Sequence, residues 1–329
     1  MFRTLTKATV ALVGSIALAA CGSSDADTSA GASGDEGGGG GGTIAVITVD
    51  PSNPYWKAEV DTAVAEAEKL GYETTVDAHN NDADRQNQFI DGAISKQVDA
   101  IILDPAGADE SVGAVQKATD AGIPVFLVNA EISEQGIAKS QIVSNNAQGA
   151  TIGAEAWVEA VGGEGKYVEL FGNPTDNNAQ VRSDGYAEVL AQYPDLELVQ
   201  QETANWDRAE GKAKMEIMLR AHPDIVGVVS GNDEMALGAI QALKDAGKLD
   251  QVTVLGFDGN PDAAAAVEAG EMVATVLQPI VDGTTLAVQQ ADAFLTDGET
   301  GASTEKQAID CILITEDNVG QLDNFVMGG

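Results

Sequence analysis

The sequence predicts an α/β protein built from two doubly wound lobes, each with a parallel sheet between layers of helices. Short apolar, β-branched runs alternate with helical patterns, and after a break at Ser144-Asn145-Asn146 the alternation starts again. Strands joined through helices form parallel sheets with right-handed crossovers. Two runs of such units therefore indicate two similar lobes.

Strands are expected where an apolar run is short and ends in polar or turn-forming residues. Ile225–Ser230 is the clearest case, because it is apolar on both parities, as in a strand buried on both faces. The other expected strands are Thr43–Thr48, Glu73–Ala78, Ala100–Leu103, Pro124–Val128, Gln141–Ser144, Lys166–Leu170, Leu196–Glu202, Thr253–Phe257, Ala274–Gln278 and Gln307–Ile314.

Helices are expected between these strands. They are Tyr55–Leu70, Ala83–Lys96, Ala108–Ala121, Ala147–Val161, Asn178–Gln192, Arg208–Ala221, Asp233–Ala246, Pro261–Ala269 and Ile280–Thr296. Behind Ile225–Ser230, either Asn232 or Asp233 can cap the next helix, since a short acceptor satisfies its free N–H groups. We assign the cap to Asp233 and a ligand contact to Asn232. Glu131–Ser140 is polar and ambiguous.

The N-terminus carries an export pattern. Residues 1–21 combine basic Arg3 and Lys7 with an apolar stretch, Ala8–Ala20, that is short for a bilayer span. Leu18-Ala19-Ala20-Cys21 resembles a bacterial lipobox, which implies lipid attachment at Cys21; the alternative is an ordinary signal peptide. Residues 22–42, rich in Gly and Ser, are expected to be a flexible tether. We expect an exported protein, periplasmic or held on the outer face of the cytoplasmic membrane by a lipid anchor only.

The charge balance excludes some partners. With 17 basic and 52 acidic residues, the formal net charge is -35. Nucleic-acid binding needs basic patches, so no nucleic-acid partner is expected. The simplest interpretation is a solvated acidic surface.

Polar residues stand at the ends of five predicted strands: Asp50, Asp104, Asn129, Asn232 and Asp258. Open α/β sheets bind ligands outside the carboxyl ends of their strands. Any one of these residues could be only a turn former or a helix cap. Five in series favour a polar pocket.

Three aromatic residues lie beside these polar loops: Tyr55, Trp56 and Trp206. Flat rings can cover the C–H face of a sugar, and amide or carboxylate groups can pair with its hydroxyls. The mixture favours a carbohydrate or polyol site. Trp157 falls in a helical pattern and is expected to be a core residue.

The catalytic patterns are weak. No nucleophile elbow, P-loop or dinucleotide fingerprint follows a strand. His79 and His222 are too few and too far apart for a zinc-site pattern, and Cys311 sits in an apolar run typical of a buried thiol. Asp104 and Asp258 could form an acid/base pair, but nothing in the sequence places them together. We expect no enzyme, no cofactor and no metal.

One stretch imitates a calcium loop, Asn80-x-Asp82-x-Asp84. Arg85 occupies the position that needs glycine, and the stretch is typical of a helix start. Calcium is therefore not expected there.

Several stretches match a known family pattern. They are Asn53-Pro54-Tyr55-Trp56, Asn205-Trp206-Asp207-Arg208, Gly231-Asn232-Asp233-Glu234-Met235-Ala236-Leu237-Gly238, Gly256-Phe257-Asp258-Gly259 and Ile314-Thr315-Glu316-Asp317-Asn318. Through them, the chain from about Thr43 to Phe325 resembles bacterial ribose-binding proteins and their relatives. These are type I periplasmic solute-binding proteins that feed sugar ABC transporters.

The resemblance implies a set of ligand-binding residues. Tyr55 and Trp56 would stack on a sugar, with Trp206 stacking from the second lobe. The implied polar contacts are Asn53, Arg182, Asn232, Asp258 and Gln278.

One position departs from the family pattern. Where ribose-type relatives usually carry Asp-Arg, this chain has Asn129-Ala130. A planar donor fork and a charged acceptor are lost there, so we expect a ligand other than ribose: another pentose, a hexose or an open-chain polyol. Glu131 is a candidate to replace the lost contacts, and Asn129 remains a candidate ligand contact.

The family also implies three crossings between the lobes, near Ser144-Asn145, Gln278-Pro279 and Asp310-Cys311. The lobes would then be 43–144 plus 279–310, and 145–278 plus 311–329. A ligand bound between them favours the closed form, which a membrane permease recognises. We expect a monomer that captures a neutral monosaccharide or sugar alcohol for an ABC importer. The alternative is a ligand-sensing protein acting through a chemoreceptor or sensor kinase.

Overall fold

Two parallel β-sheets form the framework of the part of the chain that the computed structural model describes, residues 41–328. The first sheet has the strand order β2-β1-β3-β4-β5-β11 and the second β7-β6-β8-β9. In each sheet the second strand in sequence lies at one edge, and the chain then crosses to the other side of the first strand. The predicted α/β class with parallel, doubly wound sheets is confirmed.

The strands are short and largely apolar. The first sheet contains β1 (Thr43–Thr48), β2 (Glu73–Ala78), β3 (Ala100–Leu103), β4 (Val125–Asn129), β5 (Ser140–Ser144) and β11 (Lys306–Ile309). The second contains β6 (Glu164–Phe171), β7 (Asp195–Thr203), β8 (Ile225–Ser230) and β9 (Thr253–Leu255). Beside β9 lies β10 (Thr275–Leu277), which pairs antiparallel with β12 (Ile312–Ile314).

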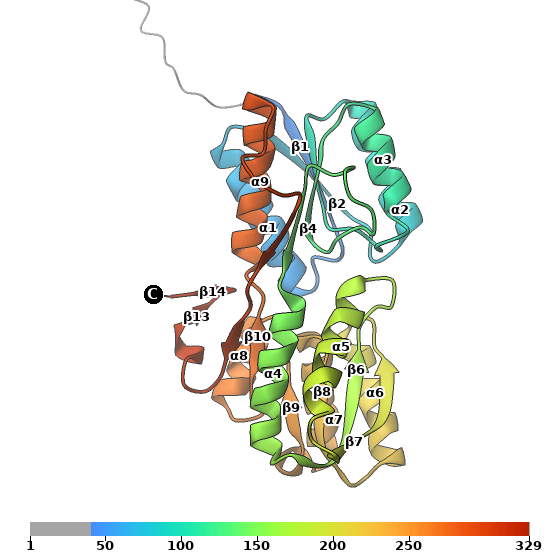
Figure 1. The fold of residues 1–329 in the computed structure, drawn as a ribbon, viewed down its shortest axis with the longest axis vertical. Coiled ribbons are helices and arrows are strands. Elements are labelled where there is room, and N and C mark those ends of the chain that lie inside the picture. The colour runs from blue at the N-terminus through green and yellow to red at the C-terminus, as the bar shows by residue number, and fades with distance from the viewer. Residues whose placement is uncertain (1–40, 329) are drawn as a thin grey trace, which may run out of the picture. The chain divides into compact units, whose positions relative to one another are not determined.

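Helices cover both faces of both sheets (Figure 1). The first sheet is covered by α1 (Pro54–Lys69), α2 (Ala83–Lys96), α3 (Val112–Asp120) and α9 (Ile280–Asp297). The second is covered by α4 (Asn146–Val161), α5 (Asn177–Leu190), α6 (Arg208–Ala221), α7 (Asp233–Asp245) and α8 (Pro261–Glu268). Short 3₁₀ turns follow at η1 (Leu249–Gln251) and η2 (Val319–Gln321), and the chain ends with β13 (Leu322–Asp323) and β14 (Val326–Met327). We call the parts built on the two sheets the first and second lobes.

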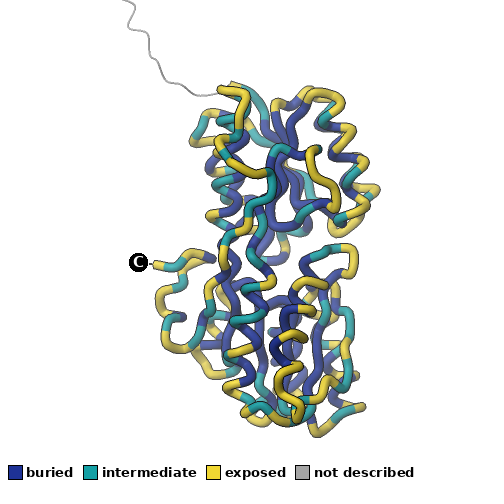
Figure 2. The backbone as a smooth tube through the Cα atoms, viewed as in Figure 1, coloured by how far each residue is buried: buried dark blue, intermediate teal, exposed yellow. Residues whose placement is uncertain are grey.

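Strand alternation explains why each sheet is buried on both faces. In β1, Ile44 and Val46 pack into the cluster that contains α1 and α9, whereas Ala45 and Ile47 pack against Ile90 of α2. Successive side chains of a strand point to opposite faces, so a strand between two helix layers must be apolar at every position. Figure 2 shows the result, with buried strands inside and exposed residues on the outer sides of the helices.

The chain passes between the lobes at Asn145, at Pro279 and at residues 310–311. The first and third connections are tied together. Asn145 Nδ2 donates to Asp310 Oδ1 at 2.8 Å, and the Gln148 amide exchanges hydrogen bonds with the backbone of Cys311. These bonds hold two of the three connections side by side.

Most predicted elements agree with the structure to within two residues at each end, but two predictions were wrong by more than that. The expected strand Gln307–Ile314 is two strands, β11 and β12, because the chain leaves the first sheet at residues 310–311. The expected helix Ala108–Ala121 begins at Val112, because the backbone of Ala108 bonds elsewhere: its N–H to Thr175 O and its carbonyl to Ser133 N.

The predicted export signal (1–21), the lipid-attachment residue Cys21 and the tether up to residue 40 lie outside the described residues. No helix between residues 41 and 328 is long and apolar enough to cross a membrane.

The centre of the second sheet gives a stability prediction. Gly227 of β8 lies directly against the indole of Trp157 on α4, and a methyl group there would overlap the ring. Gly227→Ala should lower the free energy of unfolding by about 1–3 kcal/mol, as overpacking does in tight cores. Urea unfolding measures this. Gly113→Ala on α3, where the added methyl meets open space, is the control and should be neutral or stabilising. Equal stability of the two variants would contradict the packing described.

Candidate ligand-binding site

All the residues predicted to contact a ligand line one cavity between the lobes, at the carboxyl ends of the strands. The free space there is about 260 Å³, open solvent at the mouth included. Its predicted lining residues are Asn53, Tyr55, Trp56, Asn129, Arg182, Trp206, Asn232, Asp258 and Gln278. Their roles toward a ligand stay predictions, but the geometry brings every one of them together.

Two further residues line this cavity, Asp176 and Asn178. They follow β6 through Asn173-Pro174, and a polar turn after a strand is the same pattern that predicted the other cavity residues. Applied to β6, this pattern would also have predicted Asp176 and Asn178. Asn178 Nδ2 donates to the Asn129 carbonyl oxygen at 3.1 Å, so it also joins the lobes.

On the first lobe, the start of α1 positions three of the residues. Asn53 is the N-cap: its Oδ1 accepts a hydrogen bond from Tyr55 N at 2.9 Å. Pro54 fits the first helical position, where no N–H is needed. The Tyr55 hydroxyl donates to Asn129 Oδ1 at 3.0 Å, whereas Trp56 Nε1 is buried without a partner. An unpaired buried donor is costly and marks a place where a ligand acceptor would be stabilised.

The C-terminal segment supports Tyr55 from behind. Phe325 is buried and its ring meets the Tyr55 ring edge-on, at 5.8 Å between centroids and an interplanar angle of 80°. Such T-shaped pairs are favourable beyond the area that they bury. The last short strands therefore help to fix an aromatic residue of the cavity.

On the second lobe, Arg182 of α5 is the central group. It is buried, and its Nε donates to Asn146 Oδ1 at 2.7 Å and its Nη1 to the Gly231 carbonyl at 2.8 Å. Its guanidinium lies over the Phe257 ring, 4.0 Å from the centroid, and 3.6 Å from Asp258 Oδ1. The arginine is thus held rigidly.

Asp258 is the acceptor beside this arginine. Burial raises the pKa of its carboxyl well above the usual value, against the opposing effect of Arg182. Gln278 Nε2 donates to Asp258 Oδ1 at 2.7 Å, which leaves Gln278 Oε1 buried and unpaired. The second lobe therefore also presents an unsatisfied polar atom at the cavity.

Three cavity residues have a positive φ: Asn129 (66°), Trp206 (66°) and Asp258 (131°). Such conformations are sparsely populated for non-glycine residues and persist where the surrounding structure fixes them. Backbone strain at these positions aims side chains into the space between the lobes.

The structure reverses one assignment at the end of β8. Asn232, not Asp233, is the N-cap of α7: Asn232 Oδ1 accepts from Met235 N at 3.0 Å. Asp233 is buried, and accepts from Asn260 N at 2.8 Å and Thr275 Oγ1 at 2.7 Å. Burial raises its pKa to about 7. Asn232 still lines the cavity, because capping uses its oxygen and leaves the amide N–H₂ beside the Trp206 carbonyl.

Other candidate residues lie elsewhere. Glu131 does not line the cavity; it accepts from Asn177 Nδ2 and pairs with Lys306 at 2.9 Å. Asp104 and Asp258 have different partners, Asn129 and Gln278. Their separate surroundings do not support the hypothetical acid/base pair.

Cys311, Trp157 and Asp82, which the sequence analysis also considered, have packing or capping roles in the structure. Cys311 is a buried free thiol whose pKa burial raises to about 12. Trp157 is fully buried and donates to the Thr253 carbonyl, which confirms its core position. Asp82 caps α2, and within residues 41–328 no cluster of three or more His, Cys, Asp or Glu side chains could hold a metal ion.

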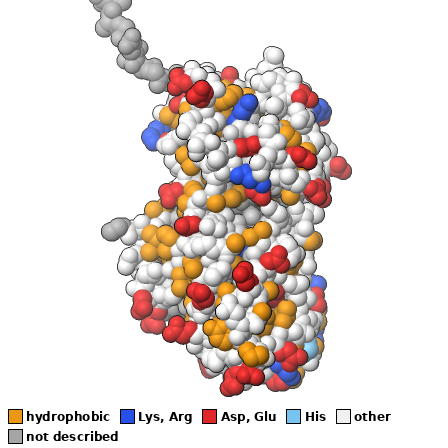
Figure 3. Space-filling view, viewed as in Figure 1, with side chains coloured by type: hydrophobic (Ala, Val, Ile, Leu, Met, Phe, Trp, Pro, Cys, Tyr) orange, Lys and Arg blue, Asp and Glu red, His pale blue; other side chains and the backbone are white. Residues whose placement is uncertain are grey.

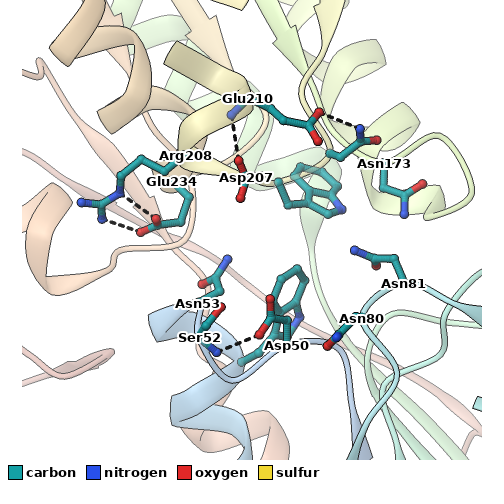
Figure 4. A pocket seen from close by; sticks show the side chains of 13 residues that line it. Asp50, Ser52, Asn53, Asn80, Asn81, Asn173, Asp207, Arg208, Glu210 and Glu234 are labelled. Carbon is teal, nitrogen blue, oxygen red and sulfur yellow. Dashed lines mark hydrogen bonds and ion pairs between the residues drawn. The ribbon is translucent and has the colours of Figure 1, made fainter. Parts of the chain in front are cut away.

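The lobes touch through backbone and side-chain bonds. Ala108 N donates to Thr175 O at 3.1 Å, and Thr175 Oγ1 donates to the Ala106 carbonyl. Thr175 also bonds Asn173, which lines an outer vestibule of about 930 Å³, open solvent included, next to the cavity (Figure 4). Asn80 and Asn81 face Asn173 across it. Trp56 and Trp206 line both spaces and so stand at the boundary between them.

The visible face of the surface agrees with the acidic composition. Figure 3 shows separate carboxylates over both lobes, with few basic side chains among them. Such scattered charges are typical of a solvated surface.

The chain matches the model of the periplasmic binding protein domain over residues 44–300. A D-apiose import binding protein of Actinobacillus succinogenes is 50% identical over 86% of this chain and 91% of its own length. The ribose import binding protein of Bacillus subtilis is 33% identical over 77% of this chain and 81% of its own. A solute-binding protein of Bacillus halodurans with bound myo-inositol superposes with a TM-score of 0.79 at 30% identity, over 87% of this chain and 98% of its own.

Fold and site therefore define a two-lobed binding protein with its cavity between the lobes. The chain belongs to the periplasmic binding protein family. Its relatives are named as binding proteins rather than enzymes, which confirms that expectation.

The reassigned cap gives a testable consequence. Asn232→Ala should lower the free energy of unfolding by about 1 kcal/mol, the usual loss for an N-cap acceptor. Asn232→Ser keeps an acceptor at the cap and should recover most of that loss in urea unfolding of the ligand-free protein. If Asn232→Ser and Asn232→Ala lower the free energy of unfolding equally, Asn232 is not acting as the cap.

Proposed function

We propose that this protein is the sugar-binding component of an ABC importer and that its ligand is D-apiose or a closely similar neutral sugar. Two D-apiose import binding proteins, from A. succinogenes and Paraburkholderia graminis, are each 50% identical over 86% of this chain. The ribose import binding proteins are more distant, at 33% and 35% identity. The higher identity to the D-apiose proteins agrees with the expectation, drawn from Asn129-Ala130, that the ligand is not ribose.

The observation that carries the proposal is the chemistry of the small cavity. Each lobe contributes a tryptophan, Trp56 and Trp206, and each contributes a buried polar atom without a partner, Trp56 Nε1 and Gln278 Oε1. A sugar offers C–H faces to the rings and hydroxyls that both donate and accept. The residues gather around one small space, which favours a single monosaccharide unit over a longer glycan.

Binding between the lobes would stabilise the closed arrangement, because only there do both sets of residues contact one ligand. The hinge would consist of the three connections near Asn145, Pro279 and Asp310, dividing the chain into 43–144 plus 279–310 and 145–278 plus 311–329. The closed monomer would then be recognised by the importer's permease. Cys21 would anchor it by lipid, with residues 22–42 as tether.

A ligand panel tests the proposal. The domain from residue 43 onward is heated with D-apiose, D-ribose, myo-inositol, xylitol or glycerol. D-apiose should raise the melting temperature most, since ligand at ~100 times its Kd adds about 2.7 kcal/mol of stability. No shift with any sugar would contradict the proposal, and a larger shift with D-ribose would contradict the assignment of the ligand.

A matched pair of substitutions tests the site. Asp258→Asn keeps the shape of the side chain but replaces an acceptor oxygen by an N–H₂ donor, and should weaken D-apiose binding about tenfold, as expected for the loss of a buried hydrogen-bond acceptor. The same change at Asp61, exposed on α1, is the control and should leave calorimetric affinity unchanged. Equal affinity of the two variants would remove Asp258 from the site.

A further inference from the structure

Two buried carboxyl groups lie together behind the first-lobe wall of the cavity. Glu59 of α1 and Asp104 at the end of β3 are each 1% exposed. The Thr48 hydroxyl donates to Glu59 Oε1 at 2.8 Å, and the Asn129 amide donates to Asp104 Oδ2 at 2.8 Å. The two carboxyls are brought side by side because Thr48, which bonds Glu59, and Asp104 directly follow the paired residues Ile47 and Leu103 on neighbouring strands.

The pair has no compensating positive charge. Neither Glu59 nor Asp104 forms an ion pair with any residue between 41 and 328, and Glu59 Oε2 receives no hydrogen bond from a fixed donor. Two adjacent buried carboxylates would be strongly destabilising. One proton held between them supplies the missing donor and removes one charge.

The titratable groups around the pair supply no positive charge. Tyr55 comes from the same helix, and Asp176 faces it from the second lobe with a pKa also raised by burial. His79 Nε2 contacts the Asp104 carbonyl oxygen at 2.8 Å, and burial lowers the pKa of the ring. Burial raises the pKa of Glu59 to about 7 and that of Asp104 well above its usual value.

The pair is connected to the cavity by a directed chain of hydrogen bonds. Because Asp104 Oδ2 accepts from Asn129 Nδ2, the Asn129 amide must turn its oxygen the other way, toward Tyr55. The Tyr55 hydroxyl donates its one proton to that oxygen at 3.0 Å. The tyrosine oxygen is then left with lone pairs only, as an acceptor for a ligand hydroxyl.

We propose that Glu59 and Asp104 share one proton and act together as positioning residues, fixing the Asn129 amide and the Tyr55 hydroxyl in the orientation that recognises the sugar. This rests on the proposed function in so far as Asn129 and Tyr55 contact the ligand. Neither carboxyl lines the cavity, so they act through these two residues.

The first test needs no ligand. A buried acid whose pKa is raised in the folded state lowers the free energy of unfolding as pH rises from its unfolded pKa to its folded pKa. For Glu59 these pKa values are about 4.5 and about 7. Above the folded pKa the loss of stability stays constant. Glu59→Gln replaces the shared proton by a permanent N–H donor. In urea unfolding between about pH 5 and pH 8, the wild type should lose stability relative to this variant. Parallel curves would overturn the shared proton.

The second test uses D-apiose as the probe in calorimetry. Asp104→Ala removes the acceptor that orients Asn129 and should weaken binding about tenfold. Asp104→Asn can still accept from Asn129 and donate to Glu59, so it should bind nearly as tightly as the wild type. As pH rises through the Glu59 pKa, wild-type affinity should fall more than that of Glu59→Gln, which keeps only the titration of the other cavity acids, Asp176 and Asp258. Full affinity in Asp104→Ala, or equal loss in both Asp104 variants, would overturn the positioning role.

A ligand-free readout separates this proposal from the proposed function. The Asn129 side-chain amide protons should exchange slowly with solvent in the wild type and Asp104→Asn, and fast in Asp104→Ala. If no sugar binds the wild type but this pattern holds, the proposed ligand is wrong and the positioning role stands. If Asp104→Ala fails to fold, slow exchange in Asp104→Asn supports the role and fast exchange overturns it.

Discussion

The buried guanidinium of Arg182 is the interaction on which the second half of the site depends. It joins α4 through Asn146, the turn after β8 through the Gly231 carbonyl and the end of β9 through Asp258. A buried charge is stable only when it is paired and hydrogen-bonded, so these segments must stay together. The planar fork also makes the arrangement directional, which a lysine could not do. One residue thereby aligns three strand and helix ends toward the same cavity.

The two lobes accommodate their buried carboxyl groups in different ways. The second lobe places Arg182 3.6 Å from Asp258, whereas the first lobe keeps two carboxyls, Glu59 and Asp104, without any cation paired to them among the described residues. In a chain with a formal net charge of -35, each buried acid adds to an existing repulsion, so a proton is the simplest counterion. The polar walls on the two sides of the cavity therefore differ. The second lobe offers the rigid Arg182 guanidinium as a donor, whereas the first lobe offers the Tyr55 oxygen as an acceptor that a chain of hydrogen bonds orients.

Much of the fold and of the site's composition could be predicted from the sequence. Buried parallel strands such as Ile225–Ser230 are apolar at every position, and their polar ends must converge because parallel strands finish at one edge. The division of roles between Asn232 and Asp233 could not be predicted, since both are good caps and only the contacts with Asn260 and Thr275 decide between them. The burial of Glu59 could not be predicted, because a carboxylate in a helical stretch that also carries Lys57 and Asp61 has the pattern of a solvated face. Its burial depends on Thr48 and Asp104, which are distant in sequence.

A crystal structure with D-apiose would test the central claim most directly, namely that one small neutral sugar is held between the two sets of strand ends. We expect density for the sugar between Trp56 and Trp206, with hydroxyls bonded to Arg182, Asp258 and the Tyr55 oxygen. A sugar seated only in the outer vestibule, or a cavity that stays without sugar at saturating concentration, would contradict it.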